Sequence, residues 1–325
     1  MDFVAQTRSL PDQLRWASSL DLPPLPGAGS VLVAGMGGSG IAGDFGSALA
    51  EGAGTRLEVV KGYGLPTWAK RERPLVVAIS YSGNTEETLS VVEEAVSGGL
   101  DVVAISSGGH LAGARAIHHI AVPGGNQPRA SLGFLLGSLC RVLQEASVLD
   151  DPGLGEAADV TEAIYGDQSG EVIDRLTEEM AGRIVIVWAA SRLTAPVAQR
   201  WKTQINENAK APAWWSVLPE ADHNEIMGWS SLAELTRASV VVVPLVDDGD
   251  LPRARTRLEL TRSLTADDVA WAEPVRSRGE APLARMLSLA AMADLVTLRL
   301  ADRYGADPEA VALIEELKRE LEESQ

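Results

Sequence analysis

Two short loops rich in glycine and hydroxyl residues follow apolar, strand-like runs in the first third of the chain. Residues 30–36 lead into Gly37-Gly38-Ser39-Gly40, and residues 74–79 lead into Ser80-Tyr81-Ser82-Gly83-Asn84-Thr85. A helix-like pattern follows each loop, so its N–H groups and hydroxyls would lie at a helix N-terminus, where peptide dipoles favour an anion. Neither loop contains lysine. This favours a phosphate monoester on a small metabolite over a nucleotide triphosphate with magnesium.

The second loop is the more informative, because turn geometry alone asks only for Gly, Asn or Asp. Thr85 is placed to cap the following helix, with Glu86 and Glu87 in its first turn. Capping accounts for one hydroxyl and leaves Ser80 and Ser82 without a structural role. The first loop by itself is explained equally well as a turn that closes a β–α unit.

The composition excludes several classes of protein. A net charge of −17 over 325 residues argues against nucleic-acid binding, which needs clustered Lys and Arg. The single cysteine, Cys140, lies in an apolar helical stretch and is expected to be buried, as suits a reducing cytoplasm. The N-terminus lacks the features of a signal peptide, and apolar runs fall short of the ~20 residues of a membrane span. The histidines lack metal-ligand spacing, so no metal site is predicted.

The elements that would hold these loops alternate between strand and helix. The apolar runs predict strands over 30–35, 57–60, 74–79, 101–105 and 117–121, and a long helix over 129–147 closes the unit. Such alternation implies an α/β fold with a parallel sheet covered on both faces. Ligands in these folds bind beyond the carboxyl ends of the strands, where both loops lie.

The second half of the chain repeats this plan more loosely. We predict strands over 183–188, 238–243 and 269–273, and helices over 194–209, 252–264, 281–303 and 308–322. We interpret residues 149–153 as an interdomain linker, which divides the chain into two domains, 1–150 and 151–325. The pair Trp214-Trp215 is expected in the core or in a dimer interface.

These loops resemble the two phosphosugar-binding loops of sugar isomerase (SIS) domains. Three further segments resemble one subgroup, the bifunctional phosphoglucose/phosphomannose isomerase family, which has tandem SIS domains. They are Pro128-Arg129-Ala130-Ser131-Leu132-Gly133, Asn206-Glu207-Asn208-Ala209-Lys210-Ala211-Pro212 and Leu218-Pro219-Glu220-Ala221-Asp222-His223-Asn224-Glu225. The resemblance covers residues 30 to 318, and the last two segments carry the narrower assignment.

The resemblance implies a cytoplasmic homodimeric enzyme of glycolysis and gluconeogenesis. It would interconvert fructose 6-phosphate with glucose 6-phosphate, mannose 6-phosphate or both through an enediol, with no metal or redox cofactor. The implied phosphate ligands are Gly38, Ser39, Ser80, Ser82 and Thr85. The implied catalytic residues are Arg129 near the reacting carbons, Glu207 as base, His223 for ring opening from the partner subunit, and Lys318 assisting it.

The chemistry of the reaction agrees with these roles. Abstracting a proton next to a carbonyl needs a base, and the developing enediolate needs positive charge. Arg129 follows a proline and opens a predicted helix, where a cation opposes the helix dipole. Acidic residues surround His223 and are expected to raise its pKa. Lys318 by itself reads as a solvated partner of Glu315 on a charged helix.

Two alternatives stay open from the sequence. A sugar-phosphate sensor could keep the loops and lose catalysis, but it would need none of the four residues Glu207, Arg129, His223 and Lys318. An isomerase or deaminase of another phosphosugar would share the loops, and only substrate assays would separate it.

Overall fold

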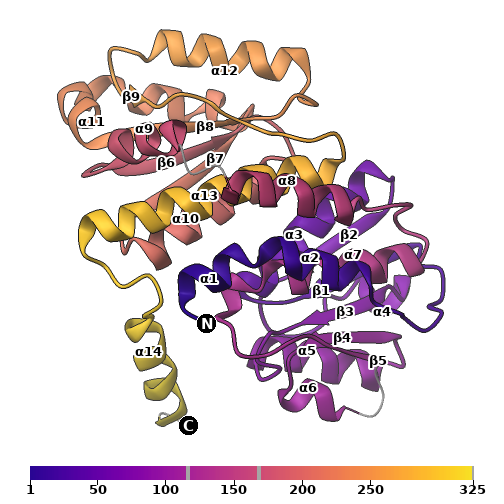
Figure 1. The fold of residues 1–325 in the computed structure, drawn as a ribbon. Helices are drawn as coiled ribbons and strands as arrows, with labels where there is room; N and C mark the ends of the chain where they lie inside the picture. The colour runs from indigo at the N-terminus through magenta and orange to yellow at the C-terminus, as the bar shows by residue number, and fades with distance from the viewer. Residues whose placement is uncertain (115–117, 167–169, 324–325) are drawn as a thin grey trace.

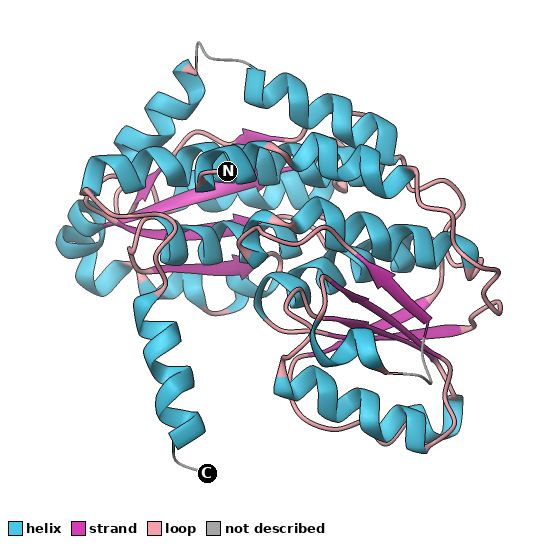
Figure 2. Ribbon diagram, turned by 60° about the horizontal axis from the view of Figure 1, so that its bottom comes forward, coloured by secondary structure: helices cyan, strands magenta, loops and turns pink. Residues whose placement is uncertain are grey.

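Two parallel β-sheets, one in each half of the chain, form the frame of the protein (Figures 1 and 2). The computed structural model describes residues 1–114, 118–166 and 170–323. The elements of the first half are α1 (Phe3–Arg8), α2 (Leu10–Ser18), β1 (Ser30–Ala34), α3 (Gly37–Gly52), β2 (Arg56–Val60), α4 (Ala69–Glu72), β3 (Leu75–Ile79), α5 (Glu86–Ser97), β4 (Val102–Ser106), α6 (Gly109–Gly113), β5 (His118–Ala121), the 3₁₀ turn η1 (Pro128–Ala130) and α7 (Leu132–Glu145).

The second half begins with two helices and then repeats the alternation. Its elements are α8 (Leu154–Gly166), α9 (Glu171–Met180), β6 (Ile184–Ala189), α10 (Ala195–Asn208), β7 (Ala213–Val217), the 3₁₀ turns η2 (Glu220–His223), η3 (Glu225–Gly228) and η4 (Ser230–Leu232), α11 (Ala233–Ser239), β8 (Val240–Val246), α12 (Pro252–Leu264), β9 (Ala270–Trp271), β10 (Val275–Arg276), α13 (Pro282–Tyr304) and α14 (Ala312–Glu323). None of the helices in these described ranges is both long and apolar enough to span a membrane.

The α/β fold class and the five strands of the first half are confirmed, the strands to within one residue at each end. Ile117, where we expected the fifth strand to begin, lies outside the described residues. The predicted helix over 129–147 begins later, at Leu132, because residues 128–130 form η1.

Three predictions for the second half are wrong in detail. Residues 238–239 end α11 and do not begin a strand. Residues 308–311 stay outside α14, since the backbone carbonyls at 308 and 309 face Arg129. The core alternative for Trp214 and Trp215 is wrong because they lie on β7, an edge strand, where they are 55% and 37% exposed, and the dimer-interface alternative stays a prediction.

The two sheets share the order of their first four strands and differ in the fifth. The first has the strand order β2-β1-β3-β4-β5, and the second has β7-β6-β8 with β9 and β10 both pairing the far side of β8. Counted within each half, both orders begin 2-1-3-4. Such sheets bind ligands where the strand order reverses, between their first and third strands. In the first sheet Ala34 pairs with Ala78, so the two hydroxyl-rich loops leave β1 and β3 side by side.

One continuous apolar core lies between the two sheets. It includes residues of α2, α7 and α8 from one end of the layer and of α10 and α13 from the other. Smaller clusters cover the outer face of each sheet, which explains why all five residues of β3 and of β4 are buried. Because the helices between the sheets share one core, the two halves are held together by it, and Figure 1 shows α10 and α13 in this layer between the sheets.

A charged cluster is buried inside this helical layer. Asp294 of α13, 1% exposed, accepts hydrogen bonds from Arg200 Nη2 at 3.0 Å and from Gln204 Nε2 at 2.6 Å, both on α10. Its second oxygen accepts a 2.8 Å bond from the hydroxyl of Tyr165 on α8. Burial, together with the Asp294 carboxylate, raises the pKa of Tyr165. The cluster therefore ties three helices together through one carboxylate.

We expect Asp294→Ala to lower the free energy of unfolding by about 3–5 kcal/mol, because it leaves the buried Arg200 without a counter-charge. Glu273→Ala is the matched control, because it removes the carboxylate of an ion pair with Arg175 whose side chains are 63% and 52% exposed. The control substitution should lower the free energy of unfolding by under about 1 kcal/mol. Urea titration of both variants measures the difference, and equal losses would contradict a stabilising role for the buried cluster.

Candidate active site

Four hydroxyl groups gather at the switch point of the first sheet. Ser80 Oγ lies 2.8 Å from Thr85 Oγ1 and 3.5 Å from Ser82 Oγ, and Ser39 Oγ accepts a 3.3 Å bond from the Tyr81 N–H. Thr85 is the N-cap residue of α5, but its side chain accepts no bond from the helix. The capping role expected for the Thr85 hydroxyl is therefore wrong, and that hydroxyl joins the cluster.

The hydroxyls also hold the loop in shape, which the sequence did not indicate. Ser80 Oγ accepts a 3.1 Å bond from the Gly83 N–H, and Ser82 Oγ accepts a 3.2 Å bond from the Asn84 N–H. Gly83 has φ +71°, and a Cβ there would lie 1.9 Å from the Gly108 carbonyl oxygen. A side chain at this position would therefore displace the loop.

Gly38 brings the first loop against the segment that carries Arg129. A Cβ at Gly38 would lie 3.3 Å from the Pro128 carbonyl oxygen and 3.4 Å from the Arg129 Cα. Arg129 lies in η1, before α7, and so it does not open the helix as predicted. The close backbone contact sets this arginine beside the hydroxyl loops.

The Arg129 side chain is 5% exposed and has partners from both halves of the chain. Its Nε donates to Asn208 Oδ1 at 3.1 Å, its Nη1 lies 3.6 Å from Glu207 Oε2, and its Nη2 donates to the carbonyl oxygens of Pro308 and Glu309. The guanidinium also stacks over the ring of Phe3, 4.4 Å from the centroid. Burial lowers the pKa of Arg129, and the Glu207 carboxylate opposes that shift.

Glu207 lies in the last turn of α10, with its side chain 30% exposed beside Arg129. Lys210 follows the helix with φ +55°, and its ammonium group donates to the Glu207 carbonyl oxygen. Desolvation lowers the pKa of Lys210, and repulsion by Arg129 adds to that shift. Sequence reasoning missed Asn208 and Lys210, although both stand in the motif that contains Glu207.

His223 and Lys318 do not meet these residues within one chain. His223 is exposed at the end of η2, beyond the carboxyl end of β7. The acidic residues around it have other partners: Asp222 binds Arg257 and Thr261, and Glu225 binds Ser216. Lys318 lies on α14, which projects from the body of the protein (Figures 1 and 2).

The corresponding edge of the second sheet has different chemistry. Its loop after β8 contains Asp247 and Asp250, whose carboxylates accept the N–H groups of Gly249 and Asp247. A cavity of about 1050 Å³ opens there. Since the chain's own carboxylates already occupy these N–H groups, this edge does not offer the neutral anion cradle that the first sheet has.

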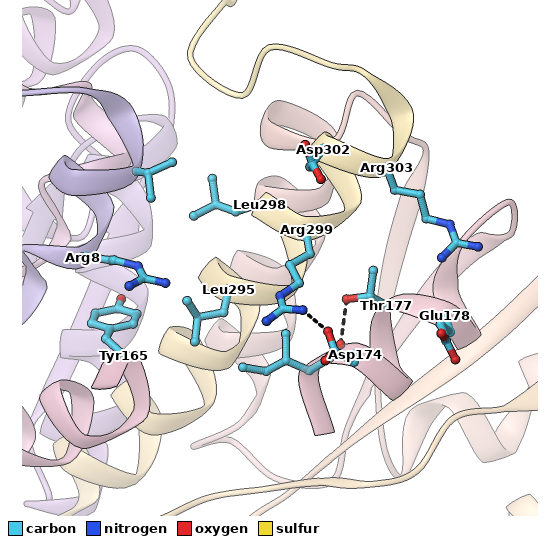
Figure 3. Close-up of a pocket in the computed structure, with 12 residues that line it drawn as sticks. Arg8, Tyr165, Asp174, Thr177, Glu178, Leu295, Leu298, Arg299, Asp302 and Arg303 are labelled. Carbon is cyan, nitrogen blue, oxygen red and sulfur yellow. Dashed lines mark hydrogen bonds and ion pairs between the residues drawn. The ribbon is translucent and has the colours of Figure 1, made fainter. Parts of the chain in front are cut away.

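A second hollow, of about 760 Å³, lies between α1, α9 and α13 (Figure 3). Its charged lining combines both signs, with Arg299 paired to Asp174, and consists of Arg8, Arg299, Arg303, Asp174, Glu178 and Asp302. None of the predicted site residues lines it. In the part of the chain that the structure describes, no group of three or more His, Cys, Asp and Glu side chains is arranged to hold a metal ion.

The site at the first sheet thus combines three chemical functions. Neutral donors at helix N-termini can hold an anionic group. A carboxylate that is partly exposed can transfer a proton. A buried guanidinium beside it can stabilise negative charge that develops during the reaction. Together with the paired parallel sheets, these features define a phosphosugar-binding α/β protein of the SIS class.

Comparison with known proteins agrees with that class. Residues 171–321 match the family described as the bacterial phospho-glucose isomerase C-terminal SIS domain. The bifunctional phosphoglucose/phosphomannose isomerase of Aquifex aeolicus is 40% identical over 319 residues, 95% of each chain. That of Thermoplasma acidophilum is 34% identical over 99% of this chain and 98% of its own. The chain belongs to the bifunctional phosphoglucose/phosphomannose isomerase family.

A solved structure shows the same fold at low sequence identity. The tagatose-6-phosphate ketose/aldose isomerase of Escherichia coli superposes with a TM-score of 0.72 at 16% identity, covering 94% of each chain. The tandem arrangement of sheets is therefore shared well beyond the family.

We expect Ser80→Ala to weaken the binding of inorganic phosphate by about 10-fold or more, because a hydrogen bond to a charged group contributes about 1.5–3 kcal/mol. Ser90→Ala is the control. Ser90 lies on the outer helix α5, where its hydroxyl bonds the backbone carbonyl of Glu87 and the backbone N–H of Gly64. Isothermal titration calorimetry measures both. Equal affinities in the two variants would show that the hydroxyl cluster is not the anion site.

Proposed function

We propose that this protein is an aldose–ketose isomerase that interconverts fructose 6-phosphate with glucose 6-phosphate and mannose 6-phosphate. The observation that carries the proposal is the contact between Glu207 Oε2 and Arg129 Nη1, 3.6 Å apart, with the Arg129 backbone packed against Gly38 of the first hydroxyl loop. Family membership supports the substrate class. A carboxylate base and a buried cation are the two groups that proton transfer next to a carbonyl requires.

In this mechanism the phosphate group anchors one end of the substrate, and carbons C1 and C2 at the other end react. Ser39, Ser80, Ser82 and Thr85 would bind the phosphate oxygens, with Gly38 leaving room for the backbone to approach. Glu207 would take the proton from C2 of the aldose and return it to C1, while the hydroxyl proton of O2 moves to O1. Binding energy from the phosphate positions the reacting carbons, so the proton transfer becomes effectively intramolecular.

Arg129 would stabilise the enediolate that forms between the two proton transfers. Its guanidinium stays charged despite burial, since arginine is not deprotonated in proteins. Burial excludes water from one side of the cation and therefore strengthens its electrostatic effect. An enediolate oxygen can replace the carbonyl oxygens of Pro308 and Glu309 as the acceptor for Arg129 Nη2.

Ring opening would use His223 and Lys318, with His223 supplied by the partner subunit of a homodimer. The exposure of His223, of Met227 in the next turn η3 and of Trp214 on β7 supports a partner chain that covers this part of the protein. Arg129 holds residues 308–309, the segment that leads into α14. Lys318 lies six residues beyond the start of that helix, about 9 Å along its axis at 1.5 Å per residue.

We place the reaction in the cytoplasm, in glycolysis and gluconeogenesis, because hexose 6-phosphates are the substrates proposed. The division into domains at about residue 150 also remains a proposal. It is supported by the change from the first sheet to the second across the loop between α7 and α8.

We expect Glu207→Gln to lower kcat for fructose 6-phosphate by about 10² or more while the sugar phosphate still binds, because the amide cannot accept a proton. Glu309→Gln is the matched control, since its carboxylate also acts on Arg129 but is exposed. The assay resolves glucose 6-phosphate from mannose 6-phosphate in steady state and single turnover. If the wild type bound the sugar phosphate without turnover, the protein would be a sugar-phosphate sensor and not an isomerase.

We expect mixed dimers to test the role of His223. His223→Ala and Glu207→Gln should each be inactive alone. When their subunits are exchanged at equal ratio, about a quarter of wild-type activity should return, because half the dimers are mixed and each then has one complete site. If His223 acted within its own chain, no mixture would regain activity.

A further inference from the structure

Asn208, the residue after Glu207, is fully buried and has both ends of its side-chain amide engaged. Its Oδ1 accepts a 3.1 Å bond from Arg129 Nε, and its Nδ2 donates a 3.0 Å bond to Thr297 Oγ1 on α13. Thr297 is itself 0% exposed. The amide is therefore a fixed link between the helical layer and the guanidinium of Arg129.

This link determines which edge of the guanidinium faces the site. Nε is directed at Asn208, which leaves Nη1 toward Glu207 and Nη2 toward the carbonyl oxygens at 308 and 309. A guanidinium is planar, so fixing Nε and the ring contact with Phe3 also fixes the plane. These two contacts therefore also determine where Nη1 lies relative to the Glu207 carboxylate.

The backbone that carries Arg129 is held from the same helix. Arg200 Nη2 contacts the Arg129 carbonyl oxygen at 3.5 Å while its main partner is Asp294 at 3.0 Å. Helix α10 thus contacts Arg129 at its backbone through Arg200 and at its side chain through Asn208, and it also carries Glu207. Helix α10 therefore positions both the base, Glu207, and the cation, Arg129.

We propose that Asn208 is a positioning residue for the isomerisation, which orients the Arg129 guanidinium toward the enediolate and Glu207. The inference rests on the proposed function. Asn208 touches no substrate; it acts through Arg129. Removing its acceptor leaves the Arg129 Nε buried without a partner and frees the guanidinium to rotate.

Three variants test this role. Asn208→Leu has a similar volume and no acceptor, and we expect kcat to fall about 10²-fold with KM within a few-fold, as a small misplacement of a catalytic group does. Thr297→Val removes the other hydrogen bond of the same amide and leaves the Arg129 contact. We expect its kcat to fall far less than that of Asn208→Leu, because the acceptor for Arg129 Nε is kept.

Asn208→Asp keeps the shape and the acceptor but adds a negative charge beside Arg129. At high pH its kcat should exceed that of Asn208→Leu. Its carboxylate oxygen can accept the hydrogen bond from Arg129 Nε, which the Leu side chain cannot do. A purely structural role would not predict that the acceptor, and not the side-chain volume, restores kcat.

The outcomes separate this inference from the proposed function. Thermal unfolding and phosphate titration show that each variant is folded, and if Asn208→Leu does not fold, Asn208→Asp and Thr297→Val decide. A wild type without turnover would overturn the proposed function. With an active wild type, the positioning role alone would be overturned if Asn208→Leu matched Thr297→Val in kcat, or if Asn208→Asp were no more active than Asn208→Leu.

Discussion

The buried guanidinium of Arg129 is the constraint on which the site depends. A cation removed from water is strongly unfavourable unless charged and hydrogen-bonding partners surround it. Here those partners come from α10, from the segment before α14 and from the ring of Phe3 near the N-terminus. Segments far apart in the sequence must therefore meet at one point. The two halves of the chain have to keep a fixed relation for that to happen.

The helical layer between the sheets supplies this fixed relation. Its single apolar core joins helices of both halves, and the Asp294 cluster adds directional bonds among α8, α10 and α13. Helix α10 belongs by topology to the second sheet, where it connects β6 with β7. Its C-terminal end nevertheless lies at the first sheet. The shared core is thus what lets a crossover helix of one half complete the site of the other.

The two sheets also show how one topology supports different chemistry. Both reverse their strand order at the same place, but the first sheet presents a cluster of Ser and Thr hydroxyls there. The second sheet has the carboxylates of Asp247 and Asp250 at this edge, beside the hydroxyls of Ser191 and Thr194. In the second sheet Asp247 and Asp250 accept the loop N–H groups, and Arg285 pairs with Asp247 at 3.3 Å. An internal carboxylate at this edge satisfies the donors that an external anion would need. The duplication of the fold therefore does not imply duplication of the site.

Apolar periodicity and turn chemistry are local properties, so the alternation of strands and helices, the burial of Cys140 and the positions of the hydroxyl loops could be predicted from the amino-acid sequence. It missed β7, whose paired tryptophans lie exposed on an edge strand, and it misread the Thr85 hydroxyl as a cap. It named Glu207 and Arg129 through resemblance but gave no reason for their meeting. Only the tertiary structure brought Asn208, Lys210 and residues 308–309 to Arg129, because a buried charge is satisfied by groups that chain packing delivers rather than by neighbours in the sequence.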